Sequence, residues 1–404
     1  MIMQISFKLI SILLVSMGIM VACNIYTFIP IYGEIASSLG IPSEAVVVAG
    51  SSFTFFYACG LLTFANIADR FGKKEILIFG MLVSALSTAL VMFSFDSWSL
   101  SITRGLQGFC LGSFAPVAFS YTYDLFGGKS RTLLLALINS GFLFAGILGQ
   151  LLSEGITKIS HWTAVFIFFS IMYLFLFLTG KKILPGTPVS ADNSDSQPAV
   201  IFFRLLQNKK LLMLYVIVFT LLSSFVVYYD SLTRFLSGKD DLLLQTRLTG
   251  LIGVSLSLYT GRLLEKLGAY KTLFIGFTLA ILSFVISFIS VYTVHPLILM
   301  TSSILFVSSI SLLIPTVITL IGDISKGERS QALSLYSFIL LGGTSLAPLA
   351  AMKLGYAQSL ILLVVCFTVN ILLGCLLSFR SSGDLEDGLQ GGNKKRRNSS
   401  FFSL

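Results

Sequence analysis

Long apolar runs without a charged residue restrict most strongly how this chain can fold. In the 404-residue sequence, residues 45–64 and 76–94 contain no charged side chain. A helix needs about 20 apolar residues to cross a bilayer, and twelve runs of this kind fit the sequence. The strands of a membrane barrel would instead alternate apolar and polar residues. The runs therefore predict an all-α integral membrane protein with twelve transmembrane helices.

One polar segment, residues 184–208, divides the expected spans into two groups of six. It contains three prolines and two aspartates, a composition typical of a linker. We expect an N-terminal bundle over residues 1–183, a C-terminal bundle over 209–379, and a disordered cytoplasmic tail over 380–404. The expected spans are 8–31, 46–67, 75–94, 98–123, 132–154, 162–181, 210–231, 244–264, 272–291, 296–321, 331–351 and 358–379.

The distribution of positive charge predicts an orientation. If the N-terminus lies inside, 21 of the 27 Lys and Arg residues fall in cytoplasmic segments and 5, Arg247 among them, in outer segments. Arg104 is left within a span. This bias is the positive-inside pattern, and it accounts for the net charge of +9 without a nucleic-acid partner. We therefore expect a multi-pass protein of the inner (plasma) membrane with both termini in the cytoplasm.

Residue patterns of metal and catalytic sites are missing from the sequence. The five cysteines lie in apolar runs, and neither they nor the two histidines show metal-ligand spacing. There is no complete phosphate-binding loop of the pattern Gly-x-x-x-x-Gly-Lys-Ser/Thr. We expect no metal, no cofactor and no enzymatic activity.

A short charged turn at residues 65–74 connects the second and third spans. Its Gly72 would let the backbone turn with a positive φ, and its basic residues would hold it on the cytoplasmic side. A related turn at residues 261–271 connects the eighth and ninth spans, 196 positions further on. The residues of interest in the two turns are Asp69, Arg70, Gly72, Lys73, Lys74, Glu265, Lys266 and Gly268.

The spacing of other residues indicates that the halves are repeats. Pro116 and Asp124 recur as Pro315 and Asp323, 199 positions later, and Arg131 recurs as Arg329 at an offset of 198. Because six spans are an even number, both halves would have the same orientation. Parallel repeats of this kind place a site near the membrane midplane and work by alternating access.

Arg104 is the most informative charge, because a buried arginine is costly in lipid and should face a partner or a wet cavity. It could take part in proton coupling or orient a substrate, or it could simply bond backbone carbonyls of the first span. Gln107 lies three residues on, hence on the same helix face. It could extend a hydrogen-bond network toward Asn24 or Tyr26.

No acidic residue lies at the middle of an expected span, so the proton carrier is the open point. Glu154 and Asp230 are the deepest candidates, both near outer helix ends. Either could bind a proton from the cavity, or both could simply mark the outer interface of the membrane.

Several glycines recur at helix-packing distances. Gly108 and Gly112 form a small-xxx-small pair, which favours close helix packing. Gly141, Gly146 and Gly149 would let the fifth span pack tightly. The alternative is that these stretches form a hinge between conformational states.

Together these features resemble the major facilitator superfamily of transporters, over residues 8–379. Residues 65–74 are similar to the family's loop signature Gly-x-Leu-Ala-Asp-Arg-x-Gly-Arg-Lys, with Ala65 in place of the first Gly and Ile67 in place of Leu. The resemblance implies that this turn packs against the other half and helps to set the outward-facing state. The charged residues and glycines of both turns are therefore candidates for conformational gating.

The fourth span carries a second signature. Arg104, Gln107 and Gly108 resemble the pattern Arg-x-x-Gln-Gly, which is often associated with proton-coupled members. Many drug/proton antiporters also have an acid in the first span, where this chain has Asn24.

The fifth span matches the antiporter signature only in part. Gly141, Gly146 and Gly149 resemble it, whereas Ile147 replaces the usual Pro and Gln150 replaces a Gly. In general appearance the chain resembles bacterial twelve-span efflux proteins of the drug/proton antiporter type.

The resemblance implies a secondary active transporter, here a monomer, that exports small organic compounds (drugs or metabolites) in exchange for protons. The same fold would serve an uptake symporter for a sugar, an organic acid or another metabolite. A membrane receptor or membrane enzyme is a third hypothesis, which the internal repetition disfavours because alternating access uses repeated halves.

Overall fold

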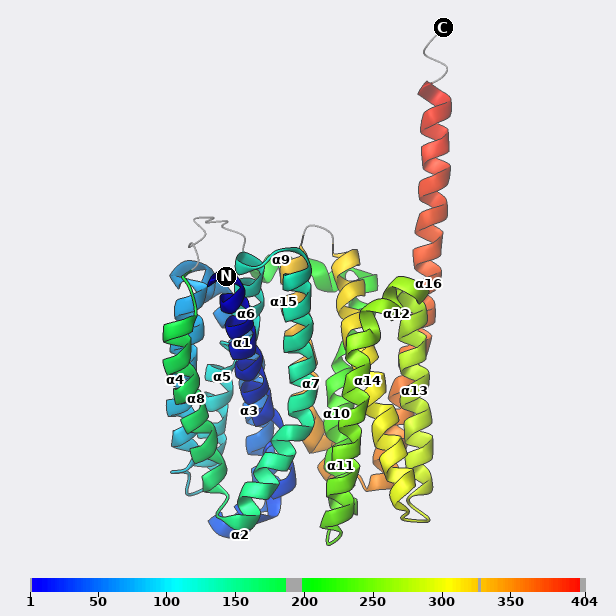
Figure 1. Ribbon diagram of the computed structural model, residues 1–404. Coiled ribbons are helices and arrows are strands. Elements are labelled where there is room, and N and C mark those ends of the chain that lie inside the picture. The colour runs from blue at the N-terminus through cyan, green and yellow to red at the C-terminus, as the bar shows by residue number, and fades with distance from the viewer. Residues whose placement is uncertain (1, 187–197, 326–327, 400–404) are drawn as a thin grey trace.

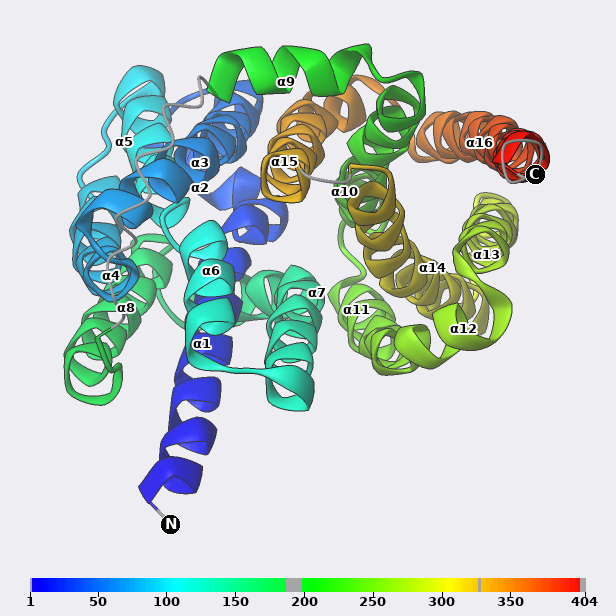
Figure 2. The same cartoon turned by 90° about the horizontal axis from the view of Figure 1, so that it is seen from above.

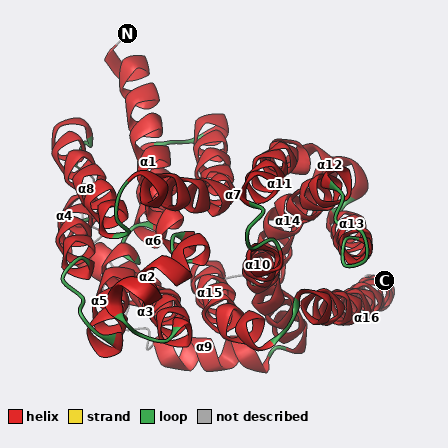
Figure 3. Ribbon diagram, turned by 90° about the horizontal axis from the view of Figure 1, so that it is seen from below, coloured by secondary structure: helices red, strands yellow, loops and turns green. Residues whose placement is uncertain are grey.

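The computed structural model describes residues 2–186, 198–325 and 328–399, and at some of these, including Asp69, Arg70 and 380–399, only the backbone. Every regular element in the described part is a helix (Figure 3). The first half comprises α1 Ile2–Tyr26, η1 Ile29–Ile31, α2 Tyr32–Leu39, α3 Ser43–Phe71, α4 Lys73–Val91, α5 Ser97–Leu111, α6 Ala115–Leu125, α7 Gly128–Ile159 and α8 Thr163–Ile183. After α9 Pro198–Gln207, the second half comprises α10 Lys209–Phe235, α11 Asp240–Val254, η2 Ser255–Tyr259, α12 Thr260–Leu267, α13 Ala269–Ile289, α14 Pro296–Ile324, α15 Arg329–Lys353 and α16 Tyr356–Ser399.

The helix lengths confirm the membrane fold. In the described part, ten helices are long and apolar enough to cross a bilayer, and the bent pair of α11 and α12 adds an eleventh. The remaining position of the twelve is occupied by α5 and α6, which are too short singly but together cover the expected fourth span. The protein is an all-α integral membrane protein of two six-span bundles.

The two faces of the bundle differ. We call the terminal face the one that carries the start of α1, α9 and α12, and the distal face the one that carries α2 (Figure 1). The bundles contact each other through α3 against α15 and through α7 against α11. Helix α9 lies across the terminal face from the first half toward the second (Figure 2), where part of the linker was expected to be irregular.

Prolines explain where the first and fourth spans are interrupted. Proline has no N–H and collides with the carbonyl group four residues earlier. Pro30 would oppose the Tyr26 carbonyl, and α1 ends at Tyr26. Pro116 would oppose the Gly112 carbonyl, and the expected span 98–123 breaks between α5 and α6. The continuous fourth span predicted from the sequence is therefore wrong.

The equivalent proline of the second half has a different effect. Pro315 lies inside α14, which continues without a break. The carbonyl four residues earlier belongs to Ser311, and it accepts a hydrogen bond of 3.2 Å from Thr260 Oγ1 on α12. A neighbouring helix thus satisfies the group that proline leaves unbonded, which membrane helices commonly need.

Two further expectations need correction. The eighth span, predicted as one helix over 244–264, is instead bent by 48° between α11–η2 and α12. The tail, predicted to be disordered, continues α16 to Ser399 and projects beyond the terminal face (Figure 1). Extending a helix adds one hydrogen bond per residue without a new nucleation step, so a stable span can carry a polar extension that could not nucleate alone.

The two turns confirm the internal repeat at the level of single dihedral angles. Gly72 has φ +95° and Gly268 has φ +80°, and each separates two helices of its half. The positive φ predicted for Gly72 is correct. The same conformation at the equivalent position supports the alignment of the two halves.

Candidate functional site

Arg104 lies at the centre of a buried polar network in the first half. It is carried by α5, which begins at Asp96, where the carboxylate accepts from the Ser99 amide at 2.7 Å. The Ser99 hydrogen bonds lower the pKa of Asp96. Arg104 is fully buried, and it donates through Nη1 to Gln107 Oε1 (2.5 Å) and through Nη2 to the Asn24 carbonyl (3.1 Å).

Gln107 extends this network to two other helices. Its Nε2 donates to Asn24 Oδ1 on α1 and to Thr88 Oγ1 on α4, both at 2.9 Å. Asn24 Nδ2 in turn donates to the Tyr173 hydroxyl on α8 at 2.5 Å. The network therefore joins α1, α4, α5 and α8, and its members are all fully buried.

Aromatic rings, and not a carboxylate, surround the guanidinium group of Arg104. Its Cζ lies 4.2 Å from the ring centroids of both Phe28 and Phe53 and 5.7 Å from that of Phe166. Among the ion pairs of the described residues, none includes Arg104. Its Nε is buried without a hydrogen-bond partner. Cation–π attraction offsets part of the desolvation cost, and the charge remains uncompensated by any anion.

The structure thus brings together three of the four polar residues singled out around the fourth span. Arg104, Gln107 and Asn24 are joined by hydrogen bonds. Arg104 also donates to a backbone carbonyl group of the first span, as the second of the two interpretations of this residue predicted. Tyr26 is not part of the described network; its ring packs against Phe225 of the second half at 5.5 Å. Thr88 and Tyr173 were missed, because hydroxyls in apolar spans commonly bond their own backbone and give little signal.

The second half has hydroxyl groups in the corresponding place. Tyr228 OH lies 2.9 Å from Ser302 Oγ and 3.3 Å from Ser287 Oγ, which lies 2.6 Å from Tyr356 OH. Ser302 lies 198 positions after Arg104 and Ser287 lies 199 positions after Thr88. The second half therefore satisfies this layer without a charge.

Asp230 is a buried acid on α10. It is fully buried, its Oδ2 accepts from Arg234 Nη2 at 2.9 Å, and its Oδ1 has no hydrogen-bond partner. The Arg234 guanidinium also lies 5.9 Å from the ring centroid of Tyr32 in the first half. The Tyr32 phenol interacts electrostatically with Asp230, Arg234 and Arg104. Asp230 therefore lies beside the boundary between the halves.

Glu154 on α7 forms a second buried ion pair, across the boundary. Its Oε2 accepts from Arg247 Nη1 on α11, and Arg247 Nη2 donates to Thr233 Oγ1 on α10 at 2.8 Å. Arg247 is fully buried near the start of α11, a contact that its count among the outer cations did not anticipate. By sequence alone, a charge seven residues after the start of α11, behind Asp240 and Asp241, is hard to distinguish from one just outside the membrane.

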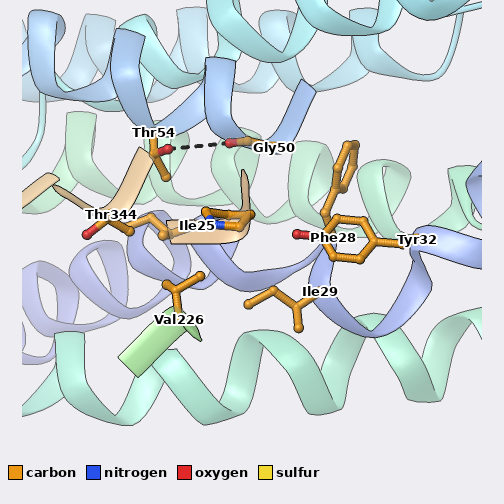
Figure 4. A pocket seen from close by; sticks show the side chains of 9 residues that line it. Ile25, Phe28, Ile29, Tyr32, Gly50, Thr54, Val226 and Thr344 are labelled. Carbon is orange, nitrogen blue, oxygen red and sulfur yellow. Dashed lines mark hydrogen bonds between the residues drawn. The ribbon is translucent and has the colours of Figure 1, made fainter. Parts of the chain in front are cut away.

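A small central pocket, of about 10 Å³, lies between the halves and is lined by residues of both, including Ile25, Phe28, Tyr32, Val226 and Thr344 (Figure 4). Ligand pockets usually measure about 300–1,000 Å³. The described conformation therefore holds at most a water molecule here, and a substrate would need the halves to separate.

The first charged turn, at residues 65–74, is fixed by a salt bridge inside its own half. Lys73 is 8% exposed, and its Nζ lies 2.6 Å from Asp124 Oδ2 at the end of α6. Lys74 is half-buried, whereas Glu265 and Lys266 of the second turn are exposed. The side chains of Asp69 and Arg70 lie outside the described residues.

The glycines sit at close helix contacts. A Cβ on Gly108 or Gly112 would collide with the backbone of α3, and one on Gly149 would collide with the backbone of Cys23 on α1. One on Gly141 would lie 3.0 Å from Ile19, and one on Gly146 would lie 3.0 Å from Phe225 of the second half. The packing interpretation accounts for all five positions.

The profile of the Major Facilitator Superfamily matches residues 14–348. The chain belongs to this superfamily. It is a membrane transporter. Its two six-span bundles, in which some spans are interrupted, are a version of the family fold.

Relatives and a solved structure agree with this assignment. The chain is 32% identical over 163 residues to a bicyclomycin resistance protein homolog of Haemophilus influenzae, covering 40% of each chain. It is 30% identical over 121 residues to the multidrug resistance protein MdtM of Escherichia coli O157:H7, covering 30% of each. The match spans 44%, 40% and 42% of the length of three curated relatives. A crystal structure of a mutant nucleoside transporter NupG shares the fold, with a TM-score of 0.69 and 13% identity over 91% of this chain and 99% of that one.

Proposed function

We propose that this transporter exports small organic molecules in exchange for protons, by alternating access between the two halves. The observation that carries the proposal is the set of four charges, Arg104, Glu154, Asp230 and Arg247, in buried or nearly buried positions on both halves. Ionisable residues in spans are expensive and mark substrate or proton pathways. Similarity to proteins named for bicyclomycin and multidrug resistance supports export.

The proton-binding candidates in this proposal are the two acids. Asp230 has one oxygen free of hydrogen bonds and lies close to Tyr32, a residue of the central pocket. Arg104 and Gln107 would act as positioning residues, holding a fixed positive charge beside the same tyrosine. A proton on Asp230 would neutralise the carboxylate and free Arg234. Loss of that proton would restore the carboxylate, for which a cationic group of the substrate could then compete with Arg234.

The proposed orientation places the terminal face in the cytoplasm. The excess of Lys and Arg in segments on that face supports it, because such residues remain on the inner side. We also propose that the first bundle ends at residue 183 and that the second begins at residue 209. In this orientation the gating turns at Gly72 and Gly268 lie on the cytoplasmic face.

Everted membrane vesicles test both direction and coupling. With an acid lumen, the wild-type protein should concentrate a fluorescent organic cation inside the vesicles, and a protonophore should abolish the accumulation. Vesicles with Lys353→Ala, which removes an exposed lysine at the end of α15, should behave like wild type. Accumulation that ignores the gradient would reject proton exchange, and accumulation only in right-side-out vesicles would favour the uptake hypothesis.

The gating turn has its own test. Asp69→Asn should slow transport while the affinity for the same cation, measured by fluorescence in detergent, stays close to wild type. An equal loss of affinity would show that the turn has a role other than gating.

A further inference from the structure

The distal ends of α7 and α11 are joined by charges in two layers. The inner layer is the pair of Glu154, 13% exposed, with Arg247, which is fully buried. The outer layer is Lys158, whose Nζ lies 3.0 Å from Glu154 Oε1 and 3.4 Å from Asp240 Oδ2. Lys158 and Asp240 are 51% and 60% exposed, and exposed pairs contribute little. The inner pair therefore carries most of the electrostatic attraction between these helices.

The two partners belong to different halves, so the distal face cannot open without separating them. While Glu154 is charged, separation removes each ion from a counter-ion in a poorly hydrated place, which is strongly unfavourable. If Glu154 takes up a proton, it becomes neutral and the attraction across the boundary is lost. Opening then no longer separates two opposite charges.

Each partner keeps a contact in its own half after such a release. Arg247 Nη2 donates to Thr233 on α10, and Glu154 lies beside Lys158 one helical turn away on α7. These contacts lower the cost of the open state, as a reversible latch requires.

Water can reach the pair from the distal face. A cavity of about 160 Å³ is lined by Glu154 and Lys158 of α7, Thr233 of α10, and Glu34 and Asp240. This volume holds several waters, since one water occupies about 30 Å³. The charged groups that face Glu154 are Arg247 and Asp240 from α11, Lys158 from α7, and Glu34 from α2 across the cavity.

Other titratable groups near this region have different contacts. Tyr229 on α10 interacts electrostatically with Arg247, and its hydroxyl is bonded to Ser303 at 2.7 Å. His161, just beyond α7, is bonded to Ser38 and Thr163. Glu154 is therefore the acid in direct contact with the cross-boundary arginine.

We propose that Glu154 is a proton-binding site that latches the distal face of the transporter. Ionised Glu154 holds α7 on α11 through Arg247; a proton taken from water in the distal cavity neutralises it and lets the helices part. On closure the proton returns to the same water, so the latch carries no net proton across the membrane, and of the two acids Asp230 is then the carrier for proton exchange. The proposal rests on alternating access, and on neither the direction of transport nor the coupling ion.

Distance measurements between the halves test the latch without any transport assay. Spin labels at Trp98→Cys, in the first turn of α5, and at Tyr292→Cys, in the turn after α13, would lie exposed on the distal face of the first and second halves, respectively. They would be placed in a full-length protein whose five native cysteines are replaced, reconstituted in lipid nanodiscs. Between about pH 8 and about pH 4, the distance distribution should shift from shorter to longer values.

Variants assign this shift to Glu154. Glu154→Gln should give the longer distances at every pH, because it leaves Arg247 unpaired. The double variant Glu154→Gln/Arg247→Gln should return toward shorter distances and ignore pH, because no buried charge remains. The matched control Glu34→Gln, in the same cavity, should keep the wild-type response.

Three results would overturn the proposal: no pH shift in the wild type, a wild-type shift in Glu154→Gln, or loss of the shift in Glu34→Gln alone. Elution of each variant as a single monodisperse peak in gel filtration controls for misfolding, and the double variant provides a readout if the single one is unstable. A pH-sensitive distal distance in a protein without proton-driven transport would support the latch and reject proton exchange.

Discussion

The two halves of this transporter share one topology but fill equivalent buried positions with different chemistry. In the first half, Arg104 and Thr88 belong to a network around a permanent cation. In the second, Ser302 and Ser287 stand at the positions 198 and 199 residues later, and hydroxyls bond one another. The fold thus needs only satisfied polar groups in this layer. The charge is an addition to one half, which points to function.

A second pair of positions shows what the halves keep in common. Asn24 bonds Tyr173 between the first and sixth spans, and Asn370 Nδ2 donates to Thr220 Oγ1 at 2.7 Å between the twelfth and seventh. Asn24 and Thr220 are 196 residues apart, and Tyr173 and Asn370 are 197 residues apart. An amide–hydroxyl contact recurs at the same place in each half, so this element of the network is structural.

Exchanging the centre of each network should produce the largest difference between the halves. Arg104→Ala should lower the rate of gradient-driven transport at least about a hundredfold, or about 2.7 kcal/mol. Ser302→Ala should leave the rate within about threefold of wild type, because it removes only neutral hydrogen bonds. Transport in vesicles with matched amounts of protein measures both.

Equal effects of these two substitutions would break the comparison. If Ser302→Ala impaired transport as much as Arg104→Ala, the layer would act through its hydrogen bonds in both halves and the charge would have no special part.

Removal of Gln107 should destabilise the first half. Gln107→Leu leaves Arg104 Nη1, Asn24 Oδ1 and Thr88 short of partners. The expected cost is about 2–3 kcal/mol, since buried groups without partners retain their desolvation penalty. Thermal unfolding in detergent measures it. A midpoint equal to that of wild type would mean that water replaces the amide.

Thr260→Val tests why α14 continues through Pro315 whereas the fourth span breaks at Pro116. The substitution removes the donor to the Ser311 carbonyl and keeps a similar shape. We expect a loss of about 1–2 kcal/mol in the free energy of unfolding. The control Thr278→Val removes a hydroxyl of α13 that bonds only within its own helix, to Phe274, and should change little. An unchanged stability of Thr260→Val would contradict the role given to this contact.

The smallest effects are expected at the two turns. Gly72→Ala and Gly268→Ala should each cost about 1 kcal/mol, because both backbones have positive φ. Gly72 should be slightly more sensitive, since a Cβ would meet the Glu75 carboxylate there and nothing within 4 Å at Gly268. Clearly unequal unfolding midpoints would show that the turns are less alike than their dihedral angles.

Sequence reasoning could predict the features that depend on composition and local geometry. Uninterrupted apolar runs dictate spans, and a glycine between charged residues predicts a turn, as at Gly72. The contact of Arg104, Gln107 and Asn24 could also be predicted, because a buried arginine must find nearby partners.

Features that depend on tertiary contacts could not be predicted. Pro116 and Pro315 occupy equivalent positions of the two halves, and the contact of Thr260 with the carbonyl group opposite Pro315 comes from another helix. The burial of Arg247 was missed because its partner Glu154 is 93 residues away and in the other half. The helical extension of α16 depends on the span that precedes it.

The most direct test of the account is whether substrate moves protons through a protein that lacks the first-half cation. Purified wild type and Arg104→Ala, reconstituted in liposomes with a pH-sensitive dye inside, would receive substrate against an imposed proton gradient. We predict substrate-induced proton movement in the wild type and none above the protein-free rate in Arg104→Ala, with Ser302→Ala close to wild type. Wild-type proton movement in Arg104→Ala would contradict the claim that the charge of the first half distinguishes the two halves in function.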